Sequence, residues 1–403
     1  MKIGIIHEGK IPHDSRVPLT PEQCVFIQEN FPVQVQVEPS HIRCFSNEEY
    51  ENQGVRLEDD LSGCDVLMGV KEVPVSELMP GKTYFFFSHT IKKQAYNRKL
   101  LQAILQKRIR LIDYETLTDE GGHRVIAFGS FAGMVGAHNA LWTLGERTGK
   151  FHLKRMKDYL HYSDAKEDYR TLELPPIKIL LTGHGRVSTG ARRVLLDLGI
   201  TEVSPSDFTK IEYPFPVFTQ LEGHDYLRRK DGVTYQKEDF YAHPELYASY
   251  FATFYRVADI LINGIFWDNR APQFFTLQEM RSPSFNISVI ADVTCDIAPS
   301  SSIPSTLRAS TIARPVYGFN PRTGEETEPF RADAVDVMAI DNLPNELCRD
   351  ASISFGNQFI AHILPELLKP ESEMLERATV AENGALGSHF QYLQDYVGEL
   401  AEA

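Results

Sequence analysis

One stretch, residues 176–203, constrains the fold more than any other part of the chain. Its aliphatic run at 177–181 predicts a buried parallel strand, and a glycine-containing turn follows at 183–190. An amphipathic segment at 191–198 predicts a helix, and a second short strand is predicted at 200–203. Strand, glycine turn, helix and strand, in this order, are typical of the unit that binds dinucleotides, where the helix N-terminus receives the pyrophosphate.

The glycine spacing departs from the usual Gly-x-Gly-x-x-Gly pattern at one position. Gly183 and Gly185 stand where the first two glycines are expected, but Ser188 stands at the third, and a glycine follows at Gly190. A tight strand-to-helix turn that binds nothing is the alternative interpretation. Two glycines so close together let the backbone approach a phosphate, which favours a nucleotide site. The predicted cofactor-binding residues of the turn are Gly183, Gly185, Arg186, Val187 and Ser188.

Length and composition exclude several classes of protein. At 403 residues the chain is too long for one simple core and predicts two domains. A formal net charge of −14 argues against a nucleic-acid-binding surface. No apolar run is long enough to cross a bilayer, and the N-terminus has the pattern of a strand and not of a signal peptide. The five cysteines lack C-x-x-C spacing, which predicts reduced thiols in a cytoplasmic protein without a zinc site or disulfide framework.

The part of the chain before the glycine turn alternates strands and helices, which predicts a parallel sheet. Thr20 followed by Pro21 predicts the start of its first helix. Lys71, His89 and Glu115 each stand at or just after the end of a predicted strand. Ligands of open α/β sheets bind at the carboxyl ends of the strands, so we expect these three side chains at one functional edge. Taken singly, each residue fits a surface position on a loop better than a functional one, and it is their shared placement at strand ends that favours function.

Two further segments have distinctive compositions. Residues 204–256 are rich in Tyr, Phe, Pro and charge, and we interpret them as an insertion in which an Asp-Gly pair suggests a hairpin. Such an insertion could cover a substrate, build a subunit contact or form a satellite hydrophobic cluster. The tail, 370–403, is amphipathic and predicts helix.

Several local stretches occur together in the order found in one family: KEVP at 71–74, FFSHTIK at 86–92, RLIDYE at 110–115, RVIAFG at 124–129, LINGI at 261–265 and IDNLP at 340–344. The chain resembles the lysine-forming saccharopine dehydrogenases nearly end to end. It is most similar to the lysine–ketoglutarate reductase portion of the bifunctional animal and plant enzymes, and more distantly to the free-standing fungal enzyme. Alanine dehydrogenases and transhydrogenase subunits share the overall domain plan of this family, but their sequences resemble these stretches less.

The resemblance implies an α/β fold with two Rossmann-like domains and a cleft between them. The first domain, which would carry substrate and catalysis, would be discontinuous and comprise residues 1–137 and 346–403. The NAD(P)-binding domain would comprise residues 138–345, with the insertion at 204–256. The long apolar segments at 131–148 and 347–368 would be the two crossings between the domains.

The chemistry implied is the reversible oxidation of a secondary amine. Saccharopine, NAD(P)+ and water would be interconverted with L-lysine, 2-oxoglutarate and NAD(P)H. By the resemblance, His89 and Lys71 are the groups that move protons. A histidine has an ordinary pKa of about 6.5, and a lysine crowded by other cations can have its pKa lowered toward neutrality. The charge of Lys92, three residues after His89, would help to lower their pKa values.

A tricarboxylate substrate also needs cationic anchors. Arg16 and Arg124 match the carboxylate-binding arginines of the family, and planar guanidinium groups suit that role. Lys92 and Glu115 complete the implied substrate site, where Glu115 would orient a lysine or receive the lysyl amine. Glu72 departs from the reductase-type pattern and matches the fungal type.

The choice between NAD and NADP depends on the adenosine end of the cofactor. NAD enzymes usually carry an acidic residue at the end of the second strand. Here Ser204, Pro205 and Ser206 occupy the predicted position and Asp207 comes late, while Arg186 could meet a 2′-phosphate or only the pyrophosphate. The cofactor is therefore NAD or NADP, and Arg186 favours NADP. The other implied cofactor-binding residues are Asn263, Gly264, Asp296, Asp341 and Leu343.

Two other functions compete with this one. Another amino-acid dehydrogenase on the same plan, such as alanine dehydrogenase, would use the same lysine and histidine but fewer cationic anchors. A non-catalytic NAD(P)-binding sensor or partner-binding protein would bind the nucleotide without turnover, and the presence of both His89 and Lys71 argues against it. The expected partners are saccharopine, lysine and 2-oxoglutarate, with no nucleic acid or membrane and with a possible homo-oligomer.

Overall fold

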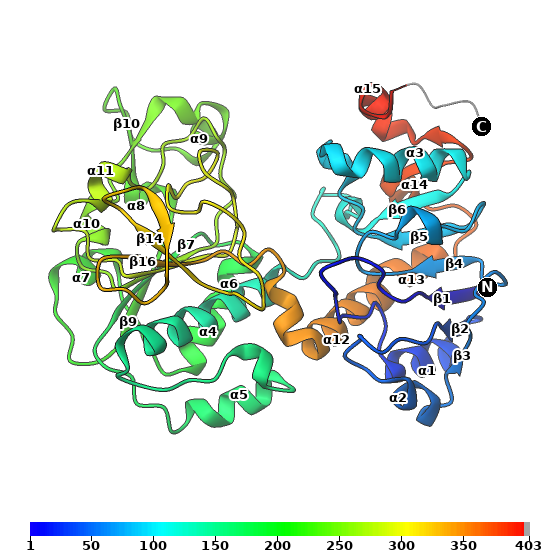
Figure 1. Cartoon of the computed structure of the whole chain (residues 1–403). Helices are drawn as coiled ribbons and strands as arrows, with labels where there is room; N and C mark the ends of the chain where they lie inside the picture. Colours follow the sequence, from blue (N-terminus) through cyan, green and yellow to red (C-terminus); the bar gives the residue numbers. More distant parts are fainter. Residues whose placement is uncertain (399–403) are drawn as a thin grey trace. The chain divides into compact units, whose positions relative to one another are not determined.

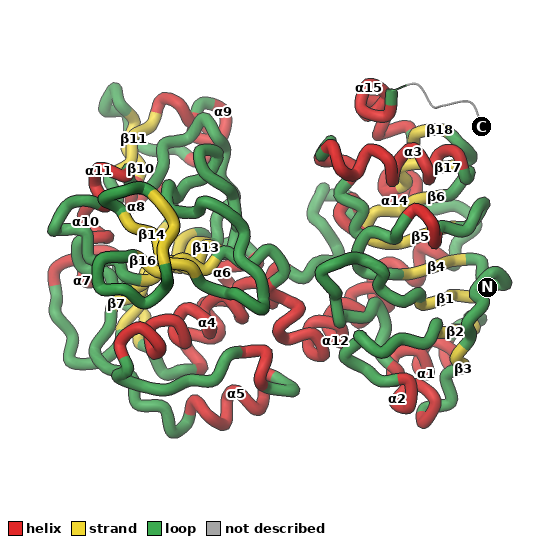
Figure 2. Tube along the Cα trace, in the orientation of Figure 1, coloured by secondary structure: helices red, strands yellow, loops and turns green. Residues whose placement is uncertain are grey.

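The computed structural model describes residues 1–398, which form two compact α/β units (Figure 1). The first unit consists of Met1–Phe128 together with the C-terminal part from Cys348, and the second is Gly129–Leu347. Each unit is built on an eight-stranded sheet of mostly parallel strands with helices around it (Figure 2). The predicted α/β class is confirmed. No helix among residues 1–398 is long and apolar enough to cross a membrane.

The sheet of the first unit has the order β18-β17-β6-β5-β4-β1-β2-β3. Its six parallel strands are β1 (Lys2–Ile5), β2 (Gln34–Val37), β3 (Arg56–Leu57), β4 (Val66–Met68), β5 (Thr83–Phe86) and β6 (Arg110–Asp113). Its α-helices are α1 (Pro21–Asn30), α2 (Asn47–Asn52), α3 (Arg98–Gln106), α12 (Cys348–Gln358), α13 (Leu364–Leu367), α14 (Glu373–Ala378) and α15 (Gln394–Val397). Short 3-10 segments are Val75–Glu77, Thr90–Lys92, Ala95–Asn97, Tyr114–Thr116 and Ser388–Leu393, and a π-helical turn at Phe359–Ile363 joins α12 to α13.

The predicted start of the first helix is confirmed at α1. The Thr20 hydroxyl accepts a hydrogen bond from the Gln23 backbone N–H, and the Gln23 side chain accepts one from the Thr20 N–H. Pro21 occupies the first turn, where a missing N–H costs nothing. The residues at the start of this helix therefore carry a local signal for its terminus, and the Gln23 side chain also donates to the Ile353 carbonyl of α12.

The expectation of a helical tail is wrong for residues 379–386. Strands β17 (Thr379–Glu382) and β18 (Ala385–Leu386) form a hairpin there, and β17 pairs antiparallel with β6 at the edge of the sheet. The hairpin turns at Asn383 and Gly384, whose φ values are 53° and 86°. Positive φ at both turn residues is what a two-residue turn requires, and Asn-Gly is its strongest sequence signal. Residues 399–403 of the predicted tail lie outside the described residues.

The sheet of the second unit has the order β15-β14-β16-β13-β12-β7-β9-β8. Its parallel strands are β7 (Lys178–Thr182), β8 (Thr201–Glu202), β9 (Val217–Leu221), β12 (Ile260–Asn263), β13 (Val289–Asp292) and β16 (Val335–Met338), and the antiparallel ones are β14 (Tyr317–Asn320) and β15 (Glu325–Thr327). Its α-helices are α4 (Gly129–Thr148), α5 (Tyr162–Tyr169), α6 (Arg186–Asp197), α7 (Pro205–Lys210), α8 (Gly223–Tyr226), α9 (Lys237–Ala242), α10 (Ala252–Tyr255) and α11 (Leu277–Met280). Short 3-10 segments are Met156–Asp158, Pro244–Leu246 and Leu343–Leu347.

The interpretation of residues 204–256 as an insertion needs a correction. Strand β9 lies inside that range but belongs to the central sheet, where it pairs with β7 on one side and β8 on the other. The segment from 222 to 256 carries the additional elements, including the separate antiparallel pair β10 (Leu227–Arg229) and β11 (Tyr247–Ser249). The Asp231-Gly232 turn follows β10, but α9 intervenes before β11, so the pair is no tight hairpin.

Two glycines bring α4 and α6 into direct backbone contact. A Cβ atom on Gly133 would lie 1.7 Å from the carbonyl oxygen of Val187, and one on Gly190 would lie 1.9 Å from that of Ser130. No side chain fits at either distance, so the two helices pack with their backbones touching. Gly190 thereby explains why the glycine turn carries a glycine two positions late.

We expect Gly190→Ala to destabilise the second unit by about 3 kcal/mol, because the added methyl group must push α6 away from α4. Both tryptophans of the chain, Trp142 and Trp267, belong to this unit, so urea unfolding followed by tryptophan fluorescence reports on it. Thr189→Ala, at the exposed neighbouring position of α6, is the control and should change the unfolding free energy by less than about 0.5 kcal/mol. An unchanged Gly190→Ala transition would contradict the contact.

Candidate functional site

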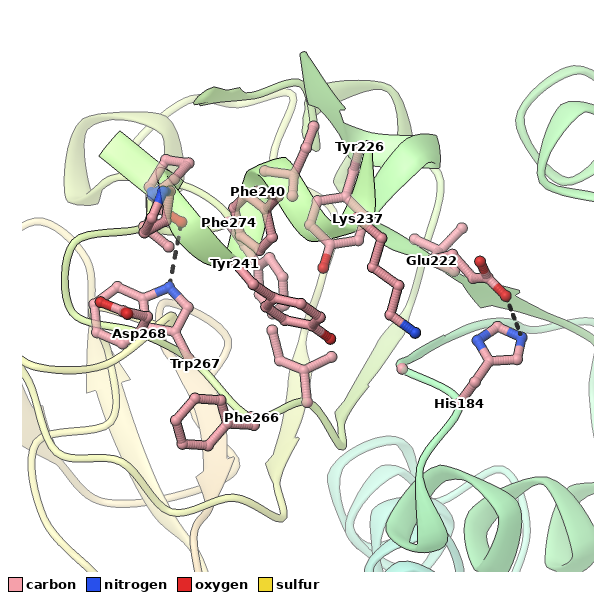
Figure 3. A pocket seen from close by; sticks show the side chains of 18 of the residues that line it. His184, Glu222, Tyr226, Lys237, Phe240, Tyr241, Phe266, Trp267, Asp268 and Phe274 are labelled. Atoms are coloured by element: carbon pink, nitrogen blue, oxygen red, sulfur yellow. Dashed lines mark hydrogen bonds and ion pairs between the residues drawn. The ribbon is translucent and has the colours of Figure 1, made fainter. Parts of the chain in front are cut away.

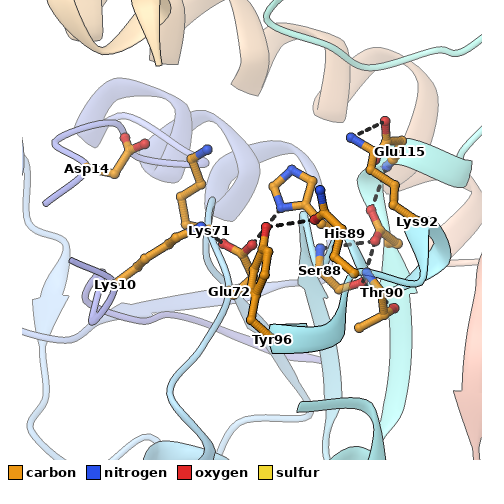
Figure 4. Close-up of polar contacts among 12 residues, drawn as sticks. Lys10, Asp14, Lys71, Glu72, Ser88, His89, Thr90, Lys92, Tyr96 and Glu115 are labelled. Atoms are coloured by element: carbon orange, nitrogen blue, oxygen red, sulfur yellow. Dashed lines mark hydrogen bonds and ion pairs between the residues drawn. The ribbon is translucent and has the colours of Figure 1, made fainter. Parts of the chain in front are cut away.

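The parallel strands of the first unit bring the predicted catalytic residues to one edge. β4, β5 and β6 are neighbours in the sheet, and their carboxyl ends point the same way. Lys71 follows β4, His89 follows β5 and Glu115 follows β6. Figure 4 shows their side chains together at this edge, as the strand-end argument predicts. Their roles in catalysis stay predictions.

A buried carboxylate holds His89. Glu72 Oε1 lies 2.6 Å from His89 Nδ1, and Glu72 Oε2 accepts a hydrogen bond of 2.6 Å from the Lys10 ammonium group. Burial alone would raise the pKa of Glu72, but the bonds and charges of His89 and Lys10 outweigh it and hold that pKa at about 2. A carboxylate can only accept hydrogen bonds, so Nδ1 carries a proton and the lone pair of the neutral imidazole is on Nε2. His89 Nε2 makes no hydrogen bond to any of residues 1–398.

The backbone at His89 adopts an uncommon conformation that its neighbours stabilise. His89 has φ 53°, in the left-handed region that non-glycine residues rarely enter. On its N-terminal side, the Ser88 N–H and hydroxyl group both donate to Asp113 Oδ2, at 3.0 and 2.6 Å. The Thr90 N–H donates to Ser88 Oγ at 3.2 Å. These bonds compensate for the strain and fix the direction in which the imidazole points.

Lys71 lies in surroundings that disfavour its charge. Burial lowers the pKa of Lys71, and the positive charges of Arg16 and Lys10 lower it further. Its backbone is held by Glu8, whose two carboxyl oxygens accept from the N–H groups of Val70 at 2.6 Å and Lys71 at 2.9 Å. Burial, with the nearby charge of Asp14, raises the pKa of Glu8 to about 8.

The predicted carboxylate anchors are already paired with carboxylates of the chain. Arg16 donates from Nε and Nη2 to the two oxygens of Asp14, at 2.9 and 2.6 Å, and both side chains are buried. The Arg16 guanidinium group also lies 4.2 Å from the ring centre of Phe128. Arg124 and Lys92 both contact Glu115 Oε1, at 3.0 and 3.3 Å, and are more exposed.

The glycine turn of the second unit follows β7 as the sequence predicts, and its role in binding a phosphate stays a prediction. Gly183 has φ 87°, and a Cβ atom there would lie 3.0 Å from both Ser188 Oγ and the Ile265 side chain. A Cβ on Gly185 would project into open space, and both glycines line a cavity. Ser188, which replaces the third glycine, is buried and donates its hydroxyl hydrogen to the Thr182 carbonyl at 2.8 Å. The serine therefore ties the helix start to the end of β7.

The other predicted cofactor residues differ in exposure. The Asn263 side chain is fully buried, where it receives a hydrogen bond from Thr182 and donates to Asp292, so only its backbone could face a ligand. Gly264 lines the cavity, and Arg186 is exposed at the start of α6. Burial and the charge of Asp292 raise the pKa of Asp296 to about 6. After β16, Asp341 is exposed and the Leu343 side chain is buried.

The strand beside β7 is not the one expected from sequence order. β9 is the neighbour of β7, and β8 lies one strand farther out. The acidic position at the end of the second strand therefore falls on Glu222, directly after β9, and not on residues 204–207. Glu222 borders the same cavity as the glycine turn and lies 3.5 Å from His184 Nε2 (Figure 3).

Four charged residues near these positions escaped the sequence analysis. Lys10, Asp14 and Glu8 follow the predicted strand at the N-terminus, so the strand-end argument used for Lys71 could have found them. Glu222 depends on knowing that β9 lies beside β7. The cleft that the resemblance implies between the two domains stays a prediction.

Known proteins share both sequence and fold with this chain. The family model described as "Alanine dehydrogenase/PNT, N-terminal domain" matches residues 4–135. "Alpha-aminoadipic semialdehyde synthase, mitochondrial" of Bos taurus is 30% identical across 94% of this chain, which spans only 46% of that relative's length. "Saccharopine dehydrogenase (NAD(+), L-lysine-forming)" of Emericella nidulans is 28% identical across 90% of this chain and 91% of its own.

A solved L-alanine dehydrogenase has the same fold, with a TM-score of 0.67 and 16% identity across the whole of both chains. At that identity the likeness shows the architecture alone. The sequence relatives, in contrast, carry the names of the enzymes that the resemblance indicates. The chain is a homologue of the saccharopine dehydrogenases and of alpha-aminoadipic semialdehyde synthase, and the family recognised from its sequence is confirmed.

Proposed function

We propose that the chain catalyses the NAD(P)-dependent interconversion of saccharopine with L-lysine and 2-oxoglutarate. The observation that carries this proposal is the cluster of Lys71, Glu72 and His89 at one edge of the first sheet. It supplies two groups that can move protons independently, one with a lowered pKa and one fixed in a single tautomer. The relatives named for this reaction support the same substrate.

Each residue of the cluster suits a different proton transfer. A neutral Lys71 can take the proton of the secondary amine, and its lowered pKa makes the neutral form easier to reach than in an ordinary lysine. His89 Nε2 can take a proton from the water that attacks the imine, and it can return that proton when the carbinolamine collapses. Glu72 stabilises the imidazolium that forms, because its own pKa of about 2 keeps it charged.

Glu115 is well placed to receive the lysyl ammonium group. Its Oε1 contacts Arg124 and Lys92, while its Oε2 is buried with no hydrogen-bond partner among residues 1–398. A buried carboxylate oxygen without a partner is costly, and a ligand ammonium group would satisfy it. Arg124 and Lys92, both partly exposed, would then face the substrate carboxylates.

The second unit fits a dinucleotide. The space beyond Gly185 would be filled by any side chain, and the adjacent N-terminus of α6 favours a pyrophosphate. When bound, the nicotinamide supplies the hydride acceptor. Glu222, at the end of β9, is positioned to accept hydrogen bonds from ribose hydroxyls and would repel a 2′-phosphate, which favours NAD over NADP. The cytoplasmic location and the homo-oligomer stay predictions.

The first experiment tests the substrate. Purified protein should oxidise NADH or NADPH when lysine and 2-oxoglutarate are both present, and neither compound alone should support the reaction. Nicotinamide absorbance at steady state measures this. Reduction of NAD with alanine but no reaction with lysine and 2-oxoglutarate would instead identify an alanine dehydrogenase, and nucleotide binding without any turnover would identify a sensor.

The pH profile tests Lys71. In the direction of saccharopine oxidation, kcat/KM should rise with pH as Lys71 loses its proton, and the midpoint of this rise should lie below the pKa of an ordinary lysine. Lys71→Met should lower kcat/KM by about a hundredfold or more and remove this rise. Lys99→Met, at an exposed position of α3, is the control and should keep the wild-type profile. A Lys71→Met enzyme with the wild-type profile would exclude Lys71 as the base.

The cofactor preference tests Glu222. The wild type should have a higher kcat/KM with NAD than with NADP, and Glu222→Ser should move that ratio by about tenfold toward NADP, the loss expected for one hydrogen bond to a charged group. Asp207→Ser, after β8, is the control and should leave the ratio unchanged. A wild type that prefers NADP, with a ratio insensitive to Glu222→Ser, would contradict the assignment.

A further inference from the structure

The cavity at the glycine turn extends well beyond the turn itself. Its volume is about 620 Å³, and its lining comes entirely from the second unit. One end is formed by Gly183, Gly185 and Glu222. The other end is aromatic and includes Tyr226, Tyr235, Phe240, Tyr241, Phe266 and Trp267.

The aromatic end has an inner layer of packed rings. Tyr226 packs edge-on against Phe274 at 5.3 Å between ring centres, and Tyr235 packs against Phe240 at 6.0 Å. Tyr226 and Phe274 are buried. These rings pack against one another and form the apolar inner surface of the cavity.

Two other rings of the lining remain largely exposed. Tyr241 on α9 is 59% exposed, and Phe266 in the loop after β12 is 87% exposed, although both border the same cavity (Figure 3). A large aromatic side chain gains little by facing water, and its flat face is well suited to stack on a planar ring. Their exposure marks a surface that a flat apolar group could cover.

The order of features along the cavity indicates which flat group could cover Tyr241 and Phe266. The glycine turn and the N-terminus of α6 suit a pyrophosphate, and Glu222 suits the ribose hydroxyls that follow it. The aromatic end comes next, beyond Glu222, in the place of the base attached to that ribose. Tyr241 and most of the inner rings come from residues 222–256, the segment added to the sheet.

We propose that residues 222–256 form the adenine wall of the nucleotide site, with Tyr241 and Phe266 as the rings that pack on the base. The proposal rests on nucleotide binding at the glycine turn, but not on the identity of the amino-acid substrate. In this proposal the role of residues 222–256 is to bind the adenine base, and not to cover the substrate or to form a subunit contact.

Isothermal titration with 5′-AMP and with nicotinamide mononucleotide separates the two halves of the cofactor. AMP should bind the wild type, and Tyr241→Ala and Phe266→Ala should each weaken AMP and NAD by about tenfold, as loss of one stacking contact does. The affinity for nicotinamide mononucleotide should stay within about twofold. Tyr250→Ala is the matched control, because Tyr250 is 57% exposed in the same segment but does not line the cavity.

The possible outcomes distinguish this proposal from the proposed function. Loss of AMP affinity in both variants supports the adenine wall even if saccharopine proves not to be the substrate. Unchanged AMP affinity in both variants, or a wild type that turns over NAD without binding AMP, overturns it. A rise in KM for saccharopine without a change in AMP affinity would show a substrate cover, and a change in oligomeric state alone would show a subunit contact; either result overturns the proposal.

Discussion

The parallel register of β4, β5 and β6 is the constraint on which the candidate catalytic site depends. Because these strands run side by side in one direction, residues far apart in the sequence leave the sheet at the same edge. The chain then needs only short loops to bring Lys71, His89 and Glu115 together. The carboxylates of two buried acids, Glu8 after β1 and Asp113 at the end of β6, accept hydrogen bonds from the backbone N–H groups of Lys71 and Ser88 and hold those loops in place. The strand ends and these hydrogen bonds together position the side chains of the site.

Charge balance is the second organising principle of this edge. The clustered cations of this edge would repel one another if they stood alone, and carboxylates of the chain pair with three of them. Asp14 forms an ion pair with Arg16, Glu72 with Lys10, and Glu115 with Arg124. The pairs differ in burial, because Arg16 and Asp14 are enclosed whereas Arg124 is partly open. A substrate carboxylate can therefore compete for Arg124 more easily than for Arg16.

The sequence predicts the features of this chain that depend on local chemistry. The capping box at Thr20, the glycine turn and the strand ends that carry Lys71 and His89 all follow from nearby residues. The position of β9 does not, because the order of strands in a sheet depends on tertiary packing and not on order along the chain. Glu222 was overlooked for that reason. Without an acidic residue at the predicted end of the second strand, the sequence pattern favoured NADP over NAD. The hairpin at Asn383-Gly384 is different: its local signal is present, but the amphipathic pattern of the tail obscured it.

Both sheets end in very short strands. β3 and β18 close the first sheet with two residues each, and β8 closes one side of the second with two more. Glu202 on β8 is also paired with Arg192, so this edge carries charge as well. A short, charged edge offers few unpaired backbone groups to a strand from another molecule. The molecule can therefore expose the carboxyl ends of its strands to ligands while its lateral edges resist aggregation.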